Sequence, residues 1–173
     1  MKFIWEIWVN IFKRGVSSEE FGHGMWLACC DSAEKFCEEY RPQLESAGYL
    51  KNSTADSIFV DETLRLHLWL VSRSLGVSDS KILDAMHNYA HHLSHVNSLS
   101  ISELYAIYDK AASEEMELID AGRSYPVLAI TVLQYIVNDK NYSNIVIAMG
   151  IHCDIDTRIK TFREIRAKTA IRN

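Results

Sequence analysis

The segment Thr54–Leu75, which reads TADSIFVDETLRLHLWLVSRSL, decides the fold of this chain. When its residues are placed at 100° steps around a helix, the apolar side chains gather on two opposite sides. One side holds Val60, Leu64, Leu68, Val71 and Leu75, and the other holds Phe59, Leu66 and Leu70. The polar gap between them holds Asp61, Arg65, Ser72 and Arg73. A helix that is apolar on two sides must be covered on both, so we expect it in the interior.

His67 flanks the first of these apolar sides and lies away from the polar gap. We therefore predict a buried, uncharged imidazole with one hydrogen-bond partner, with a metal ligand or a catalytic base as the alternative. The segment 125–138 is apolar nearly all round, which predicts a second interior helix.

Capping residues predict where the other helices begin and end. Ser17 with Glu20 and Ser100 with Glu103 have the spacing of capping boxes, and Ser124 is the N-cap expected before Pro126. The expected helices are 1–14, 17–41 (ending before Pro42), 54–75, 78–97, 100–122, 124–138 and 154–171, with a short segment 143–149 ending at Gly150. The whole chain, 1–173, is thus predicted to be a single all-α domain, a bundle of about six or seven helices.

The composition is that of an ordinary soluble globular protein. Of 173 residues, 48% are hydrophobic and 24% are charged, and the net charge is −5. No apolar run reaches the length of a membrane-spanning helix, so we expect none. The four cysteines lack a CxxC pair, which favours reduced thiols in a cytoplasmic protein. Phosphate-binding glycine loops and the nucleophile elbow are also missing from the sequence, so an enzyme is the less favoured class.

Three of the seven histidines, His87, His91 and His95, follow one another at four-residue spacing in the expected helix 78–97. On a helix this spacing aligns the imidazoles along one side, where a His-x-x-x-His pair can present two nitrogens to one metal. Two ligands make an open site, so we expect no tightly bound cofactor and only weak zinc or nickel binding. A partner surface that charges near neutral pH and an ordinary solvated face are the alternatives.

The N-terminal segment 1–14 is expected to be an apolar helix that carries Trp5, Trp8 and Phe12. A helix this apolar must be covered. Its own domain, a partner protein or second copy, and the membrane interface are the three candidate covers.

The C-terminal part, residues 143–173, carries six basic and three acidic residues, although the whole chain is acidic. The run Ser143–Ile151 followed by the basic helix 154–171 resembles a DNA-reading helix-turn-helix, which implies nucleic-acid contacts from Arg158, Lys160, Arg163 and Arg166. The alternative is that the apolar side of this helix docks on the domain while its basic side faces water.

These patterns favour a non-enzymatic cytoplasmic protein of regulatory or adaptor type that binds another protein, or a second copy of itself, through segment 1–14 or the histidine face. The first alternative is a nucleic-acid-binding regulator that uses the basic C-terminal helix. The second is a metal-binding protein that uses the histidine row.

Overall fold

The computed structural model describes residues 15–75, 79–90 and 100–172 of the chain. Over these ranges the chain forms six helices and one pair of two-residue strands. The elements are β1 Val16–Ser17, α2 Ser18–Ser46, α3 Ser53–Ser74, α4 Ser80–Ala90, α5 Ile101–Asp120, α6 Val127–Ile136, α7 Ile145–Ala167 and β2 Ile171–Arg172. The prediction of an all-α helical bundle is confirmed.

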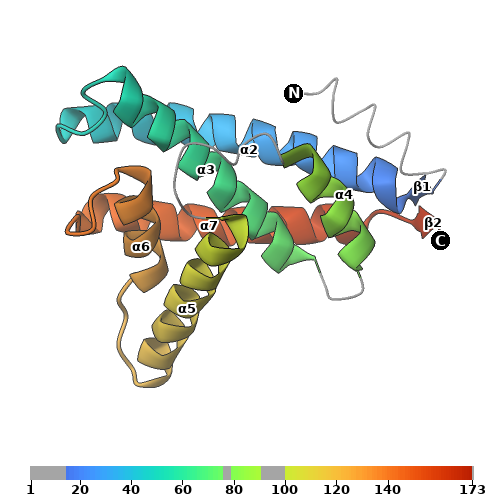
Figure 1. Cartoon of the computed structure of the whole chain (residues 1–173). Helices are drawn as coiled ribbons and strands as arrows, with labels where there is room; N and C mark the ends of the chain where they lie inside the picture. The colour runs from blue at the N-terminus through green and yellow to red at the C-terminus, as the bar shows by residue number, and fades with distance from the viewer. Residues whose placement is uncertain (1–14, 76–78, 91–99, 173) are drawn as a thin grey trace.

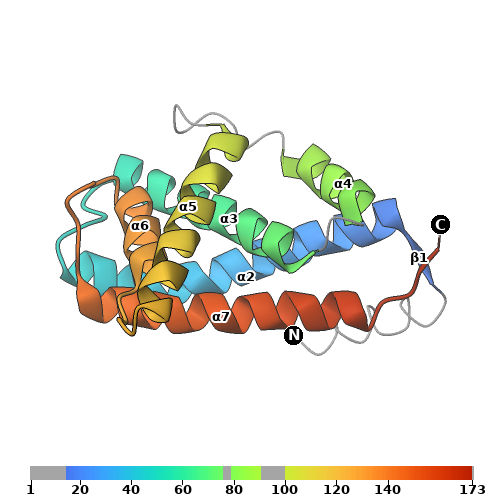
Figure 2. The same cartoon turned by 90° about the horizontal axis from the view of Figure 1, so that it is seen from below.

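Two long helices, α2 and α7, run the length of the molecule, and α3 slants between them in contact with both (Figure 1). Seen from below, α5, α6 and the first turns of α7 gather at one end, and α4 packs on α2 at the other (Figure 2). Helix α3 also contacts α5 and α6. It is therefore the central helix of the bundle.

The burial of α3 confirms the prediction that this segment is interior. Its residues from Leu66 to Val71 are all at most 1% exposed. Six of the ten residues of α6 are buried, so the second expected interior helix is confirmed as well. One continuous cluster of buried apolar side chains joins these two helices to the others.

Two positions of α3 do not follow the helix projection. Val60, expected on an apolar face, is 40% exposed, and Arg65, expected in the polar gap, is 1% exposed. Only Phe59 is buried in the first two turns of α3, whereas nearly every residue from Glu62 to Val71 is buried. The helix is thus covered on one side near its start and all round further on, so the apolar pattern alone misplaces these two residues.

Both predicted capping boxes form. The amide of Glu20 donates to Ser17 Oγ at 3.1 Å, and the amide of Ser17 donates to Glu20 Oε2 at 2.8 Å. Ser100 and Glu103 make the same reciprocal pair at the start of α5. These signals are local in the sequence, because both partners lie within one turn of the helix start.

Helix α2 does not end before Pro42 as expected but continues to Ser46. Proline removes the hydrogen bond to the carbonyl four residues earlier, here that of Glu38. Pro42 and Glu38 are both exposed, so water can hydrate that carbonyl. The extra turn buries Leu44, which is 0% exposed. Gly48, at φ +85°, then follows the C-cap and turns the chain away.

Helix α7 is one continuous helix from Ile145 to Ala167, so the predicted break at Gly150 and the predicted start at Asp154 are wrong. The side chain of Asn144 caps it by accepting from the amides of Val146 and Ile147 at 3.1 and 3.2 Å. Gly150 lies inside the helix, where Tyr40 Oη is 3.4 Å from the place a Cβ would take. This glycine therefore lies within a continuous helix beside Tyr40 and does not end one, and the turn that a helix-turn-helix needs is not there.

The C-terminal helix ends at Ala167, earlier than the expected residue 171. The chain beyond it forms β2, which pairs in parallel with β1 in the register Val16↔Ile171. A two-residue strand carries no pattern that a sequence reading could detect, so this pairing of the two ends of the described chain was missed.

Helix α4 lies within the predicted helix 78–97, although Ser78 and residues 91–99 are outside the described residues. It packs against α2 at Gly22, where a Cβ would stand 2.6 Å from the Cβ of Ala85. Gly22, which lies inside helix α2, therefore allows α2 and α4 to cross closely. Among the described helices, none combines the length and apolar character that crossing a membrane requires.

Candidate functional site

Half of the ten predicted binding residues lie outside the described residues: Trp5, Trp8, Phe12, His91 and His95. His87 is described: it is partly buried on α4, and its Nε2 is 3.1 Å from the Tyr105 hydroxyl of α5. Within the described ranges, no three His, Cys, Asp or Glu side chains are grouped so that they could hold a metal ion. The metal site at His87, His91 and His95 therefore stays a prediction.

Two of the four basic residues proposed for nucleic-acid contact form ion pairs within the protein. Arg166 makes a two-pronged pair with Asp79, with Nη2 2.7 Å and Nε 3.0 Å from Asp79 Oδ1. Arg158 Nε is 2.6 Å from Asp154 Oδ2. Lys160 and Arg163 are exposed. The nucleic-acid alternative thus keeps part of its basic surface but has no helix-turn-helix geometry behind it.

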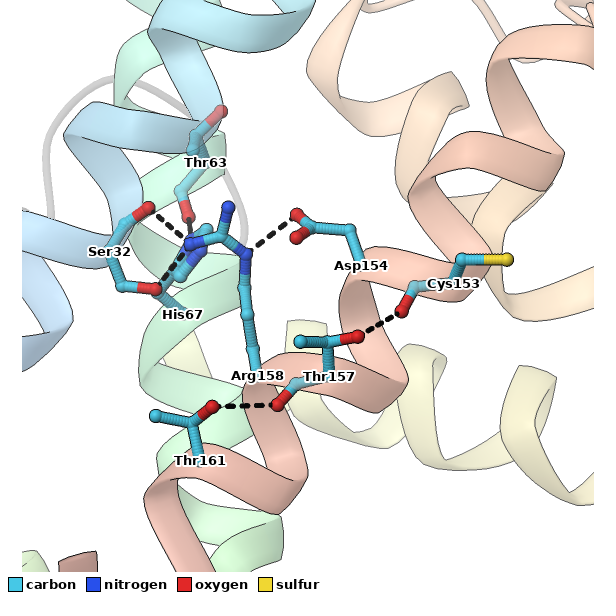
Figure 3. A network of polar contacts seen from close by, with 8 residues as sticks. All are labelled: Ser32, Thr63, His67, Cys153, Asp154, Thr157, Arg158 and Thr161. Atoms are coloured by element: carbon cyan, nitrogen blue, oxygen red, sulfur yellow. Dashed lines mark hydrogen bonds and ion pairs between the residues drawn. The ribbon is translucent and has the colours of Figure 1, made fainter.

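Arg158 is the centre of a polar junction between α2, α3 and α7 (Figure 3). Its Nη1 donates to the carbonyl oxygen of Ser32 at 2.6 Å, and its guanidinium carbon is 5.7 Å from the centre of the Phe36 ring. Asp154, one turn earlier on α7, balances the charge. These contacts fasten α7 to α2 with a partly buried cation.

His67 lies at the same junction and is 0% exposed, which confirms the predicted buried histidine. Its Nδ1 is 2.7 Å from the carbonyl oxygen of Thr63, so Nδ1 must donate and carries the proton. Burial, and then the positive charge of Arg158, lower the pKa of His67 from 6.5 to about 3. The ring is neutral and enclosed, which suits a structural role and leaves it out of reach of a substrate.

A buried ion pair on α3 was missed by the sequence reading. Arg65 Nη1 is 3.5 Å from Glu62 Oε1, and both side chains are 1% exposed. Burial, and then the charge of Glu62, hold the pKa of Tyr108 well above its usual range. The three-residue spacing of Glu62 and Arg65 could have indicated this ion pair, because residues three apart on a helix are neighbours. The helix projection instead placed Arg65 in the polar gap of the segment, which suggested that it faces water.

Glu115 of α5 joins three helices with one carboxylate. Its Oε2 accepts from the amide of Leu128 at 2.8 Å, and its Oε1 is 3.0 Å from Nδ1 of His152 on α7. Pro126 is the N-cap of α6 and makes no side-chain cap hydrogen bond, so the predicted N-cap Ser124 is wrong. Glu115 takes that role from a neighbouring helix, because it continues the buried stripe of Leu104, Tyr108 and Ala111 on α5.

An exposed apolar surface adjoins this contact. Met116 is 59% exposed and Ile119 is 50% exposed on the last turns of α5. Ile145 and Met149, 44% and 45% exposed, lie on the first turns of α7. We call these four residues, together with Glu115 and His152, the α5–α7 face.

The contact between Glu115 and His152 holds the two halves of this face together. Ile119 lies one turn after Glu115 on α5, and Met149 lies one turn before His152 on α7, so both flank the contact. Figure 1 shows the C-terminal end of α5 projecting away from α2, α3 and α7. That end is therefore accessible to a partner.

The two features differ in what they can do chemically. The polar junction at Arg158 and His67 is enclosed and holds helices together, whereas the α5–α7 face presents apolar side chains to solvent. Contiguous exposed apolar surface is the usual mark of an interaction site. Comparisons with protein-family models, with curated proteins and with solved structures found no match to this chain.

Proposed function

We propose that this chain is a non-enzymatic protein of regulatory or adaptor type that binds another protein through the α5–α7 face. The observation that carries the proposal is the exposure of four large apolar side chains on two helices that one carboxylate–histidine contact joins. Methionine supplies two of the four, and flexible, polarisable methionines suit binding surfaces that adapt to a partner.

The chemistry of the titratable groups supports a binding rather than a catalytic role. His67, whose pKa is strongly lowered, and Tyr108, whose pKa is strongly raised, are both 0% exposed. A catalytic acid or base must reach its substrate, and these two groups cannot. The four cysteines are unpaired, which fits the reducing cytoplasm that we propose as the protein's location.

The proposal is tested by affinity purification with the full chain from the cells that produce it. The test variant is Met116→Gln/Ile119→Gln, and the matched control is Leu27→Gln, because Leu27 is 47% exposed on α2, away from the face. We expect a protein that the wild type and the control retain and the double variant loses. Retention of the same proteins by all three, or of none by the wild type, would contradict the proposal.

A further inference from the structure

The α5–α7 face has the composition of a binding surface for one kind of partner. We propose that the partner segment bound there is an amphipathic helix of another protein, an inference that rests on the proposed function. This helix has apolar residues on one side and lysine or arginine along the edge of that side. Such helices place anchors at three- and four-residue spacing into an apolar surface. The charges around the face select the basic flank.

The apolar anchors on the face have helical spacing. Met116 and Ile119 are three residues apart on α5, and Ile145 and Met149 are four residues apart on α7. Each pair therefore forms a short apolar ridge along its own helix. Both ridges flank the contact between Glu115 and His152, so a helix bound over this contact would meet side chains of both ridges.

One wall of the face is uncharged. The first nine residues of α7, Ile145 to Cys153, contain no aspartate, glutamate, lysine or arginine. A partner that lies along this wall meets apolar side chains and His152. The wall therefore matches the apolar side of an amphipathic helix.

The other wall is acidic. The exposed residues Glu114, Glu117 and Asp120 lie on the last two turns of α5, where Lys110, 3.7 Å from Glu114, is the nearest basic residue on the helix. No basic residue lies in the last turn of α5, although the C-terminal end of a helix favours positive charge. The next basic residue, Arg123, follows beyond the helix end.

The acidic end of α5 favours a cationic partner for two reasons. Lysine or arginine from a partner would pair with Glu117 and Asp120 and would also compensate the negative end of the α5 dipole. The same charges repel phosphate, so they disfavour nucleic acid and an anionic membrane as occupants of this face.

The test measures binding of two synthetic helical peptides to the full chain. Both share one leucine pattern; LKKLLKLLKKLLKL carries lysine on the polar side, and LEELLELLEELLEL carries glutamate. We expect the lysine peptide to bind at least about tenfold more tightly than the glutamate peptide, with an affinity that falls as salt is raised.

Three variants assign that binding to the face. Met116→Gln/Ile119→Gln and, separately, Met149→Gln should each weaken the lysine peptide, and Glu117→Gln/Asp120→Asn should remove about tenfold of its affinity. The control Glu38→Gln/Glu39→Gln neutralises two exposed acids on α2 and should change the affinity much less. Circular dichroism checks that each variant is folded as the wild type is.

Equal binding of the two peptides, or equal losses with the face and control variants, would overturn the basic-helix proposal. If Met116→Gln/Ile119→Gln still loses its cellular partner in that case, the proposed function stands and only the kind of occupant is wrong. If the double variant keeps both the partner and the lysine peptide, both proposals fail. A concentration-dependent rise in mass that the face variants abolish would identify a second copy of the chain as the occupant and would overturn the basic-helix proposal.

Discussion

His67 and Arg158 lie together in the enclosed junction, and only one of them is charged. Arg158 has Asp154 and Ser32 as partners, whereas His67 is held neutral by burial and by the guanidinium beside it. The Nε2 atom of His67 has no hydrogen-bond partner among the described residues. A protonated His67 would place a second positive charge beside Arg158, so the fold requires the neutral ring.

The neutral His67 makes stability depend on pH. Because its pKa falls from 6.5 in the unfolded chain to about 3 in the folded one, only the unfolded state takes up the proton between these values. The free energy of unfolding therefore decreases as the pH falls below 6.5. We expect this residue alone to remove about 2–3 kcal/mol between pH 6.5 and about 4.5.

Urea unfolding of the wild type and of His67→Gln across this pH range measures that contribution. The difference in stability between the two proteins should shrink as the pH falls, because the variant lacks the titrating ring. His23→Gln is the matched control, since His23 is exposed on α2. A wild type whose stability runs parallel to that of His67→Gln at every pH would show that His67 is not buried as described.

At the scale of the element, the helix starts that were predicted correctly are those whose signals are local. The capping boxes at Ser17 and Ser100 form because both of their partners lie within the same turn. The start of α6 was wrongly placed at Ser124, and the carboxylate that accepts from the amide of Leu128, that of Glu115, lies on another helix. The spacing of residues around a helix start cannot predict a capping side chain that belongs to a neighbouring helix.

Because Glu115 and not Ser124 caps α6, two substitutions near the start of this helix should differ in their effect on the free energy of unfolding. Glu115→Ala should lower the free energy of unfolding by about 1–3 kcal/mol, since it leaves the amide of Leu128 without its acceptor. Ser124→Ala should change it by less than about 0.5 kcal/mol, because Ser124 is exposed and is not the cap. Thermal or urea unfolding of the two variants compares them directly, and the reverse order would restore Ser124 as the cap.

Two glycines lie inside helices, and the space available for a side chain differs between them. At Gly22 a Cβ would stand 2.6 Å from the Cβ of Ala85 and 2.8 Å from the carbonyl oxygen of Ile82. At Gly150 the nearest atom, Tyr40 Oη, is 3.4 Å away. The first position is closed to a methyl group, and the second nearly admits one.

We therefore expect Gly22→Ala to destabilise the protein by about 1–3 kcal/mol through overpacking between α2 and α4. Gly150→Ala should be close to neutral or stabilising by up to about 1 kcal/mol, because alanine is the better helix former. Melting temperatures of both variants test the pair. Equal behaviour of the two would mean that α2 and α4 do not approach each other as closely as Gly22 implies.

At the scale of the whole molecule, the all-α class and the burial of α3 and α6 followed from the apolar pattern and the capping residues of the sequence. The same apolar pattern misplaced Arg65, because a helix covered all round buries its polar residues as well. The pairing of β1 with β2 and the union of α5 with α7 at Glu115 join residues far apart in the chain. Contacts of that kind depend on the fold, so no single segment of sequence predicts them.

The candidate site was predicted least well for the same reason. Its apolar residues, Met116, Ile119, Ile145 and Met149, come from two helices, and the sequence of neither helix shows that the two lie together. The face exists only because the fold places these two helices together, each packed on α6 and joined to the other by the contact between Glu115 and His152. The residues singled out in the sequence were conspicuous by type, as tryptophan or histidine, rather than by their position in the fold.

The claim that the protein acts through the α5–α7 face is tested most directly by hydrogen exchange of the full chain, alone and with the peptide LKKLLKLLKKLLKL. Slower exchange on peptide binding should concentrate at the end of α5, around Met116 to Asp120, and at the start of α7, around Ile145 to Met149. Exchange in the first half of α2, including Leu27, should stay unchanged. Protection confined to other helices, or no protection in α5 and α7, would contradict the account.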